Sequence, residues 1–199
     1  MYSSHYEKLG ASERCIDDEI PFEIPMNWKW VHISEIGTLV RGSGIQKHDT
    51  TSTGKQCVRY GEIYTSYYHA FFEANTFTTE QVFARCKHIR NSDLIFTLTG
   101  ENKPDIAKTI AYLGNDEIAV GGDLAIWSNH YCNPKYLSYF MNSNFAIEQK
   151  VNVATGDIIV HISCDKVGRF LMPLPPIVEQ NRIVKKLDQL LPICEELNF

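Results

Sequence analysis

This 199-residue chain lacks a hydrophobic run long enough to span a membrane. Its first residues, Met1-Tyr2-Ser3-Ser4-His5, are polar and contain no apolar segment of the kind found in signal peptides. The sequence therefore predicts a cytoplasmic protein that is neither secreted nor anchored in a membrane.

Closely spaced cysteines are also absent. The six cysteines are scattered over the chain and form no CxxC pair; they are Cys15, Cys57, Cys86, Cys132, Cys164 and Cys194. Disulfide scaffolds and zinc sites show tighter spacing than this. We therefore expect reduced thiols and no structural metal.

Complete catalytic motifs are missing as well: there is no HExxH zinc motif and no phosphate-binding loop. Asn133-Pro134-Lys135-Tyr136 partly matches the loop with which amino-methyltransferases hold their target, but asparagine before proline is better explained as a helix start. Pro104-Asp105 with Glu148-Gln149-Lys150 partly matches the PD…ExK pattern of metal-dependent nucleases, but Glu148 is expected on a helix rather than a strand. We predict no catalytic residue, no metal and no cofactor in this chain.

A strong positive charge, which would mark a general nucleic-acid binder, is lacking too. The net charge is −5, but it is distributed unevenly. Residues 1–28 carry two basic and six acidic side chains, residues 29–108 carry ten and eight, and residues 109–199 carry seven and ten. Only the middle of the chain has an excess of basic side chains, which is a weak indication of an anionic partner.

The sequence does contain many short strand-like runs interspersed with helix signals. We predict strands at Gln56–Tyr60, Asp93–Leu98, Ile106–Leu113, Asp123–Trp127 and Ile158–Ile162. This pattern predicts an α+β fold, with a mixed, mostly short-stranded sheet, packed helices and a final coiled-coil-type helix. The predicted units are a polar lead-in or linker over 1–20, a domain over 21–176 and a helix over 177–199.

The final helix has the clearest periodicity. Pro175-Pro176 ends a short apolar strand, because proline cannot donate to a strand ladder yet fits the first turn of a helix. Apolar residues then recur at steps of four and three, as in a helix that packs along another helix. This predicted seam consists of Ile183, Leu187, Leu190, Cys194 and Leu197. Pro192 leaves the straightness of the helix open.

Polar and basic side chains gather in three predicted loop regions between residues 42 and 108. Lysines and arginines bind DNA phosphates, while Gln, Asn, Arg and hydroxyl groups contact base edges. The candidate DNA-binding residues are Ser43, Gln46, Lys47, Lys55, Arg59, Tyr67, Thr99, Asn102, Lys103 and Lys108. We assign the four lysines to phosphates, and Gln46, Arg59, Tyr67 and Asn102 to positions near bases.

Taken in order, four segments resemble one half of a type I restriction–modification specificity subunit: a target recognition domain followed by the start of the conserved spacer helix. The first consists of residues 24–30 and 33–37, and the second of residues 59–63, a strand-and-turn signature. The third consists of residues 92–102, 106–108 and 121–125, and the fourth of residues 160–163, 173–176 and 179–184. The last is the most specific, because it holds Pro173-Leu174-Pro175-Pro176 and Glu179-Gln180-Asn181-Arg182.

This resemblance implies a non-catalytic reader of double-stranded DNA that recognises half of a bipartite target. It implies docking to methyltransferase subunits, which use S-adenosylmethionine, and to a restriction subunit. Since one recognition domain is present, the chain is a fragment, a half-subunit that pairs with itself as a homodimer, or a recombination cassette. The alternative is a protein-interaction module, an adaptor or inhibitor that dimerises through its last helix. A stand-alone methyltransferase or nuclease is the least favoured interpretation.

Overall fold

The computed structural model describes residues 6–9, 12–17 and 20–197. Its centre is a five-stranded sheet in the order β4 (Thr38–Arg41), β14 (Leu124–Ser128), β10 (Leu94–Thr97), β12 (Thr109–Tyr112) and β7 (Ala70–Phe71). The pairs are antiparallel except for β12 with β7. Every residue of β10 and β12 is buried.

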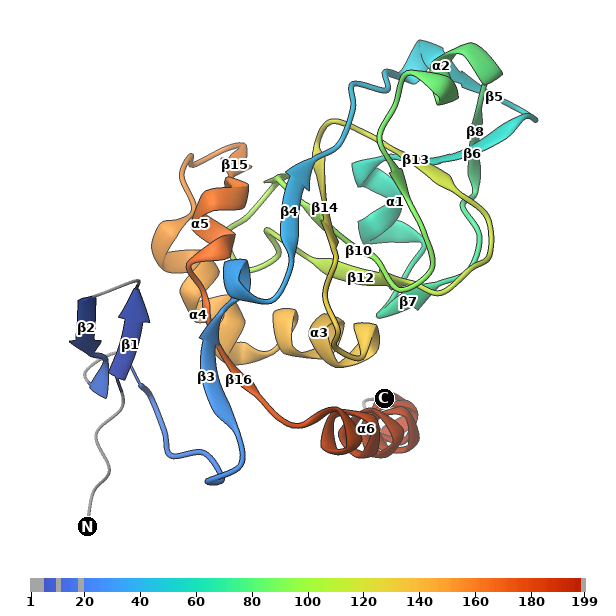
Figure 1. Ribbon diagram of the computed structural model, residues 1–199. Coiled ribbons are helices and arrows are strands. Elements are labelled where there is room, and N and C mark those ends of the chain that lie inside the picture. Colours follow the sequence, from blue (N-terminus) through green and yellow to red (C-terminus); the bar gives the residue numbers. More distant parts are fainter. Residues whose placement is uncertain (1–5, 10–11, 18–19, 198–199) are drawn as a thin grey trace.

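The central strands contribute to a hydrophobic core on each face of the sheet, because successive side chains of a strand point to opposite sides. Leu94 and Phe96 join one hydrophobic core, and Ile95 joins the other. The first core is completed by α3 (Pro134–Met141), α4 (Asn144–Val153) and α5 (Cys164–Gly168), which Figure 1 shows on one side of the sheet.

A second five-stranded sheet forms the upper right part of the molecule in Figure 1. Its order is β5 (Thr50–Thr51), β8 (Thr76–Thr78), β6 (Lys55–Val58), β13 (Ile118–Val120) and β9 (His88–Ile89). It carries the helices α1 (Tyr60–Thr65) and α2 (Glu80–Ala84), and a 3-10 turn at Lys47–Asp49. Two small pairs complete the main body: β11 (Thr99–Gly100) with β15 (Val160–His161), and β16 (Leu171–Leu174) with β3 (Lys29–His32).

The last helix, α6 (Ile177–Leu197), starts directly after Pro175 and Pro176. The carbonyl of Pro176 accepts hydrogen bonds from the N–H groups of Glu179 and Gln180, which closes the first turn. Trp28 donates to the Glu179 carboxylate at 3.0 Å, so the first turn is also tied to the segment before β3. The helix continues through Pro192.

The α+β prediction is confirmed, including the final helix, whereas pairing of that helix in a coiled coil stays a prediction. Two local features differ from the sequence analysis. The lead-in contains a two-stranded antiparallel sheet, β1 (Tyr6–Leu9) with β2 (Ser12–Cys15). The sequence analysis missed it, because a four-residue strand is too short to show a clear alternation of apolar and polar residues. Arg59–Ile63, predicted to be a strand and turn, instead forms the cap and first residues of α1, where the Arg59 N–H donates to Glu62. Among the described residues, no helix is long and apolar enough to cross a membrane.

Candidate nucleic-acid interface

Two glycine-containing turns, at residues 42–44 and 121–122, cross in direct contact where the two large sheets meet. The N–H of Ser43 donates to the Val120 carbonyl at 2.8 Å, and the N–H of Gly42 donates to the Leu124 carbonyl at 2.8 Å. A Cβ atom on Gly42 would lie only 2.3 Å from the Gly121 carbonyl oxygen. The crossing therefore requires glycine at position 42, because any side chain would force the two backbones apart.

Basic side chains surround this crossing. The Arg41 guanidinium donates to the Gly122 carbonyl at 2.5 Å, and the Lys87 ammonium donates to the Arg41 carbonyl at 2.7 Å. Arg59 adjoins the same turn, since a Cβ on Gly121 would lie 3.5 Å from its Cα. We call Arg41, Ser43, Arg59, Lys87 and Gly122 the crossing face. It carries three basic side chains and a hydroxyl group on a backbone that is fixed by the glycine contact. Arg41 also lies 3.8 Å from the Asp123 carboxylate, and the Ser43 hydroxyl accepts from the Lys87 N–H at 2.8 Å.

Thr99 borders the crossing face from β11. The N–H of Leu98 donates to the Asp123 carbonyl at 2.8 Å, which joins the two segments. Thr99 pairs across the sheet with His161, and its hydroxyl lies 3.5 Å from the imidazole Nδ1. Both side chains and Arg41 line a shallow pocket of about 390 Å³. The structure thus brings Ser43, Arg59 and Thr99 to one region of the surface.

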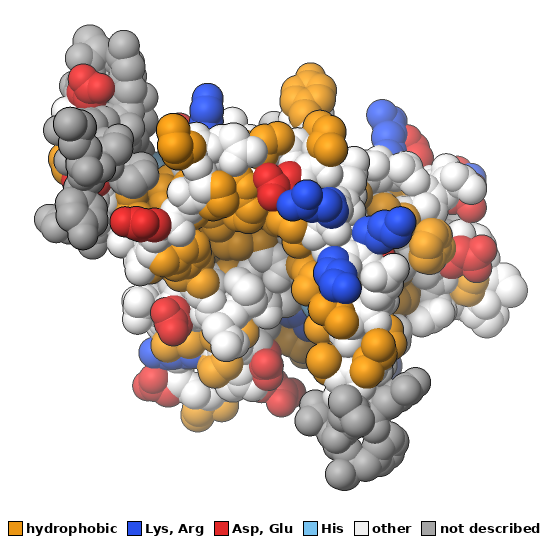
Figure 2. All heavy atoms as spheres, turned by 90° about the horizontal axis from the view of Figure 1, so that it is seen from below, with side chains coloured by type: hydrophobic (Ala, Val, Ile, Leu, Met, Phe, Trp, Pro, Cys, Tyr) orange, Lys and Arg blue, Asp and Glu red, His pale blue; other side chains and the backbone are white. Residues whose placement is uncertain are grey.

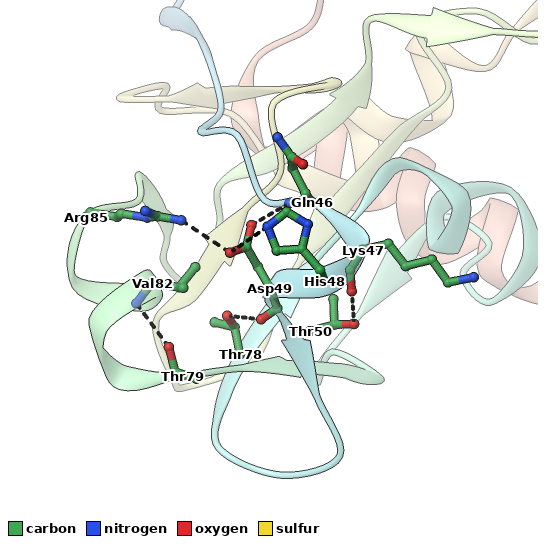
Figure 3. A network of polar contacts seen from close by, with 9 residues as sticks. All are labelled: Gln46, Lys47, His48, Asp49, Thr50, Thr78, Thr79, Val82 and Arg85. Atoms are coloured by element: carbon green, nitrogen blue, oxygen red, sulfur yellow. Dashed lines mark hydrogen bonds and ion pairs between the residues drawn. The ribbon is translucent and has the colours of Figure 1, made fainter.

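Gln46 and Lys47 lie further out, on the turn shown in Figure 3. Asp49 organises this turn, because its carboxylate accepts from the Gln46 N–H at 2.8 Å and pairs with Arg85 at 3.3 Å. The Lys47 side chain extends away from the network, and its ammonium has no ion pair among the described residues. Lys55, also exposed, pairs with Glu80 at 3.5 Å.

Four of the predicted DNA-binding residues either make contacts within the fold or lie in the loop that precedes β12. The Tyr67 hydroxyl donates to Glu62 at 3.0 Å, and its ring stacks on Phe71. The Lys108 ammonium donates to the Tyr67 carbonyl at 3.2 Å, and burial lowers the pKa of Lys108. The Asn102 amide makes two hydrogen bonds with Asp105, and Lys103 is half-buried in the same loop. Tyr67 and Lys108 therefore have less freedom to contact a ligand than Lys47 has.

The sequence analysis missed Arg41 and Lys87. Each stands at the end of a short segment with no other polar signal, and only the crossing of two distant turns brings them together. A basic residue directly before Gly42-Ser43-Gly44 was the one signal available in the sequence for Arg41.

The partial nuclease pattern does not assemble into a metal site. Asp105 and Lys150 line one cavity, but Glu148 is exposed, because residues two apart on a helix point to opposite sides. Within the described residues, no group of three His, Cys, Asp or Glu side chains could hold a metal ion. Asn133 instead caps α3, accepting from the N–H groups of Lys135 and Tyr136 at 2.9 and 3.2 Å.

Helix α6 turns one face toward its own domain. Val184 is buried in the main core, and Gln180 accepts from the Asn133 N–H at 2.8 Å while donating to the Pro175 carbonyl at 2.8 Å. Of the predicted seam, Ile183 packs partly against the core and Leu187 lines the cavity with Lys150, whereas Leu190 is 42% exposed and Cys194 is exposed. The side chain of Leu197 lies outside the described residues.

The outer face of α6 is mixed in character. Figure 2, seen from the α6 side, shows basic side chains gathered among apolar ones. The exposed basic residues of α6 are Arg182, Lys185 and Lys186, and its exposed apolar residues include Ile177, Val178, Leu190 and Ile193.

Comparison with solved structures identifies the fold as that of type I specificity subunits. The HsdS subunit from Thermoanaerobacter tengcongensis has a TM-score of 0.61 at 18% identity, covering 89% of this chain and 40% of that one. The S subunit of a type I restriction–modification system from M. genitalium has a TM-score of 0.54 at 16% identity, covering 90% and 43%.

A particular curated relative agrees with this. The chain is 24% identical to the type I restriction enzyme EcoAI specificity subunit of Escherichia coli, over 92% of this chain. The match spans 31% of the length of that relative. No family model matches the sequence. The resemblance to one recognition-domain-sized part of a specificity subunit is therefore confirmed.

Proposed function

We propose that this chain is a non-catalytic DNA-recognition element of a type I restriction–modification system, with residues 21–176 as its DNA-binding domain. The observation that carries the proposal is similarity to a specificity subunit over 92% of the chain. The crossing face supports it, because three basic side chains adjoin a backbone crossing that the glycine contact fixes.

In this proposal, phosphate and base contacts come from different parts of the surface. Lys47 and Lys55, which are exposed, would bind phosphates and orient the duplex. Arg59, Ser43 and Thr99 would lie nearer the base edges, since they stand beside the fixed glycine crossing. Gln46, Asn102 and Lys103 are the adjoining loop contacts, while Tyr67 and Lys108 would act mainly by supporting the loops.

We also propose that α6 is the start of a spacer helix, over residues 177–199, that docks the partner subunits in the cytoplasm. These partners are methyltransferase subunits, which would supply S-adenosylmethionine, and a restriction subunit. Exposed Leu190 and Cys194 are available for a second helix, from another recognition domain or from a second copy of this chain. Each recognition domain would read half of a bipartite target.

The test is selection of bound duplexes from a random pool by the full chain, co-purified with the methyltransferase subunits of its own system, at two salt concentrations. Enrichment of a short split or palindromic site is expected, with tighter binding at low salt because phosphate contacts release counterions. Arg59→Ala should relax the preference at one position by roughly 1–3 kcal/mol. A well-formed complex that enriches no sequence would contradict the proposal.

A second candidate function is an adaptor or inhibitor that binds protein and no DNA. The observations that favour it are the net charge of −5 and the exposed Leu190 and Ile193 on α6. Light scattering of the purified chain, compared with Leu190→Glu, tests self-pairing. If the variant remains dimeric, that apolar surface does not form the dimer.

A further inference from the structure

A cavity of about 530 Å³ lies between α6, α3, α4 and the loop that precedes β12. This volume falls within the range of pockets that hold small molecules. Its apolar lining comes from Pro104, Ile147, Leu187 and Leu191, and its aromatic lining from Tyr68 and Tyr139. The cavity is separate from the crossing face, since none of the five crossing-face residues lines it.

Lys150 of α4 lines this cavity, and among the described residues it is the charged side chain that is fully buried. The residue is only 1% exposed, and Asp105 is the one carboxylate that lines the same cavity. Burying an ammonium group with so little water around it is costly unless a negative charge compensates it.

The polar neighbours of Lys150 are engaged elsewhere. The Asn142 amide donates to the Thr109 carbonyl at 2.7 Å, and the Ser143 hydroxyl caps the N–H of Ala146. Asp105, at the exposed rim, accepts from Asn102 at 2.6 Å. The lining also includes His69 and Tyr68, so the Lys150 ammonium is one of several polar groups that a molecule in the cavity would meet.

The charges around the cavity select the ligand class. The lining holds two lysines, Lys150 and Lys108, the second of which already donates to the Tyr67 carbonyl, together with the His69 imidazole and the Asp105 carboxylate. A monoanion can pair with the Lys150 ammonium, whereas a phosphate dianion would bring a second negative charge into a largely apolar space. The apolar and aromatic walls require an apolar body beside the charged group.

We propose that this cavity binds a small organic monocarboxylate, with the carboxylate on the Lys150 ammonium and the apolar body against Leu187, Leu191 and Tyr139. The ligand would thereby contact α6 directly and join the helix to the domain. Lys108 lines this site and also belongs to the proposed DNA-binding loops, so ligand binding and duplex binding are tested separately.

The test is isothermal titration calorimetry of the full chain with 3-phenylpropionate, using the uncharged 3-phenylpropionamide as the matched ligand. The acid should bind at least about tenfold more tightly than the amide. Lys150→Met keeps the length of the side chain and removes the charge, so it should abolish that preference and still fold. Lys29→Met, at an exposed position on β3, serves as the control and should bind like the unchanged chain.

Equal binding of the acid and the amide would overturn the proposal. Undiminished binding of the acid to Lys150→Met would do the same, because the carboxylate would then lie elsewhere. Failure of 3-phenylpropionate, benzoate and hexanoate alike to bind the folded chain at millimolar concentration would also overturn it.

Discussion

Replacing Lys150 by methionine should stabilise the protein, and the gain should depend on pH. Burial lowers the pKa of Lys150 from 10.5 to about 7, with Asp105 opposing the effect. Each tenfold change in proton affinity corresponds to about 1.4 kcal/mol, so the buried charge costs up to roughly 5 kcal/mol. Relaxation of the surroundings reduces such penalties, and we expect a gain of about 2–5 kcal/mol at pH 6.

The direction of the pH dependence follows from proton linkage. Between pH 7 and 10.5 the unfolded chain holds a proton on Lys150 that the folded chain has released, so the stability of the unchanged protein rises with pH there. The penalty is complete below the folded pKa and disappears above the unfolded pKa. The advantage of Lys150→Met should therefore fall to roughly half by pH 9.

Urea unfolding of the two proteins at pH 6, 7, 8 and 9 measures this difference directly, since the other titrating groups are common to both. Lys47→Met, at an exposed position, should show no comparable change with pH. A stability difference between Lys150→Met and the unchanged chain that is constant from pH 6 to 9 would refute the reasoning, because it would reflect packing alone.

Three further predictions concern the crossing face, the loop lysines and α6. Gly42→Ala should lower the free energy of unfolding, measured in urea melts, by about 1–3 kcal/mol, because its Cβ would lie 2.3 Å from the Gly121 oxygen. The control Gly44→Ala meets nothing within 4 Å and should change that free energy by under about 0.5 kcal/mol. Lys47→Ala should weaken binding to all duplexes alike and reduce the slope of log affinity against log salt concentration by about one. Lys108→Ala should change that slope less, because its ammonium is engaged by the Tyr67 carbonyl. Equal slopes for the two variants in a fluorescence titration would contradict the assignment of Lys47 to a phosphate. Gln180→Ala should cost about 1–3 kcal/mol, because the Asn133 N–H and the Pro175 carbonyl lose their buried partner, and an unchanged melting curve would argue against this docking of α6.

The sequence was sufficient for features that depend on neighbouring residues. Pro175-Pro176 predicts the end of β16 and the start of α6, and Asn133-Pro134 predicts the start of α3, because a missing N–H and a capping side chain act locally. The apolar run Leu94–Phe96 predicts a strand for the same reason. The α+β class follows from the order of such signals.

Only the tertiary structure decided which distant residues meet. Arg41 and Gly122 are in contact because two glycine turns cross, and no local pattern encodes that crossing. The same holds for Lys150, whose position on a helix predicts an exposed lysine until α3, α6 and the loop before β12 enclose it. Side-chain type and spacing determine the elements, whereas burial and long-range contact decide which of their polar groups remain free to bind a ligand.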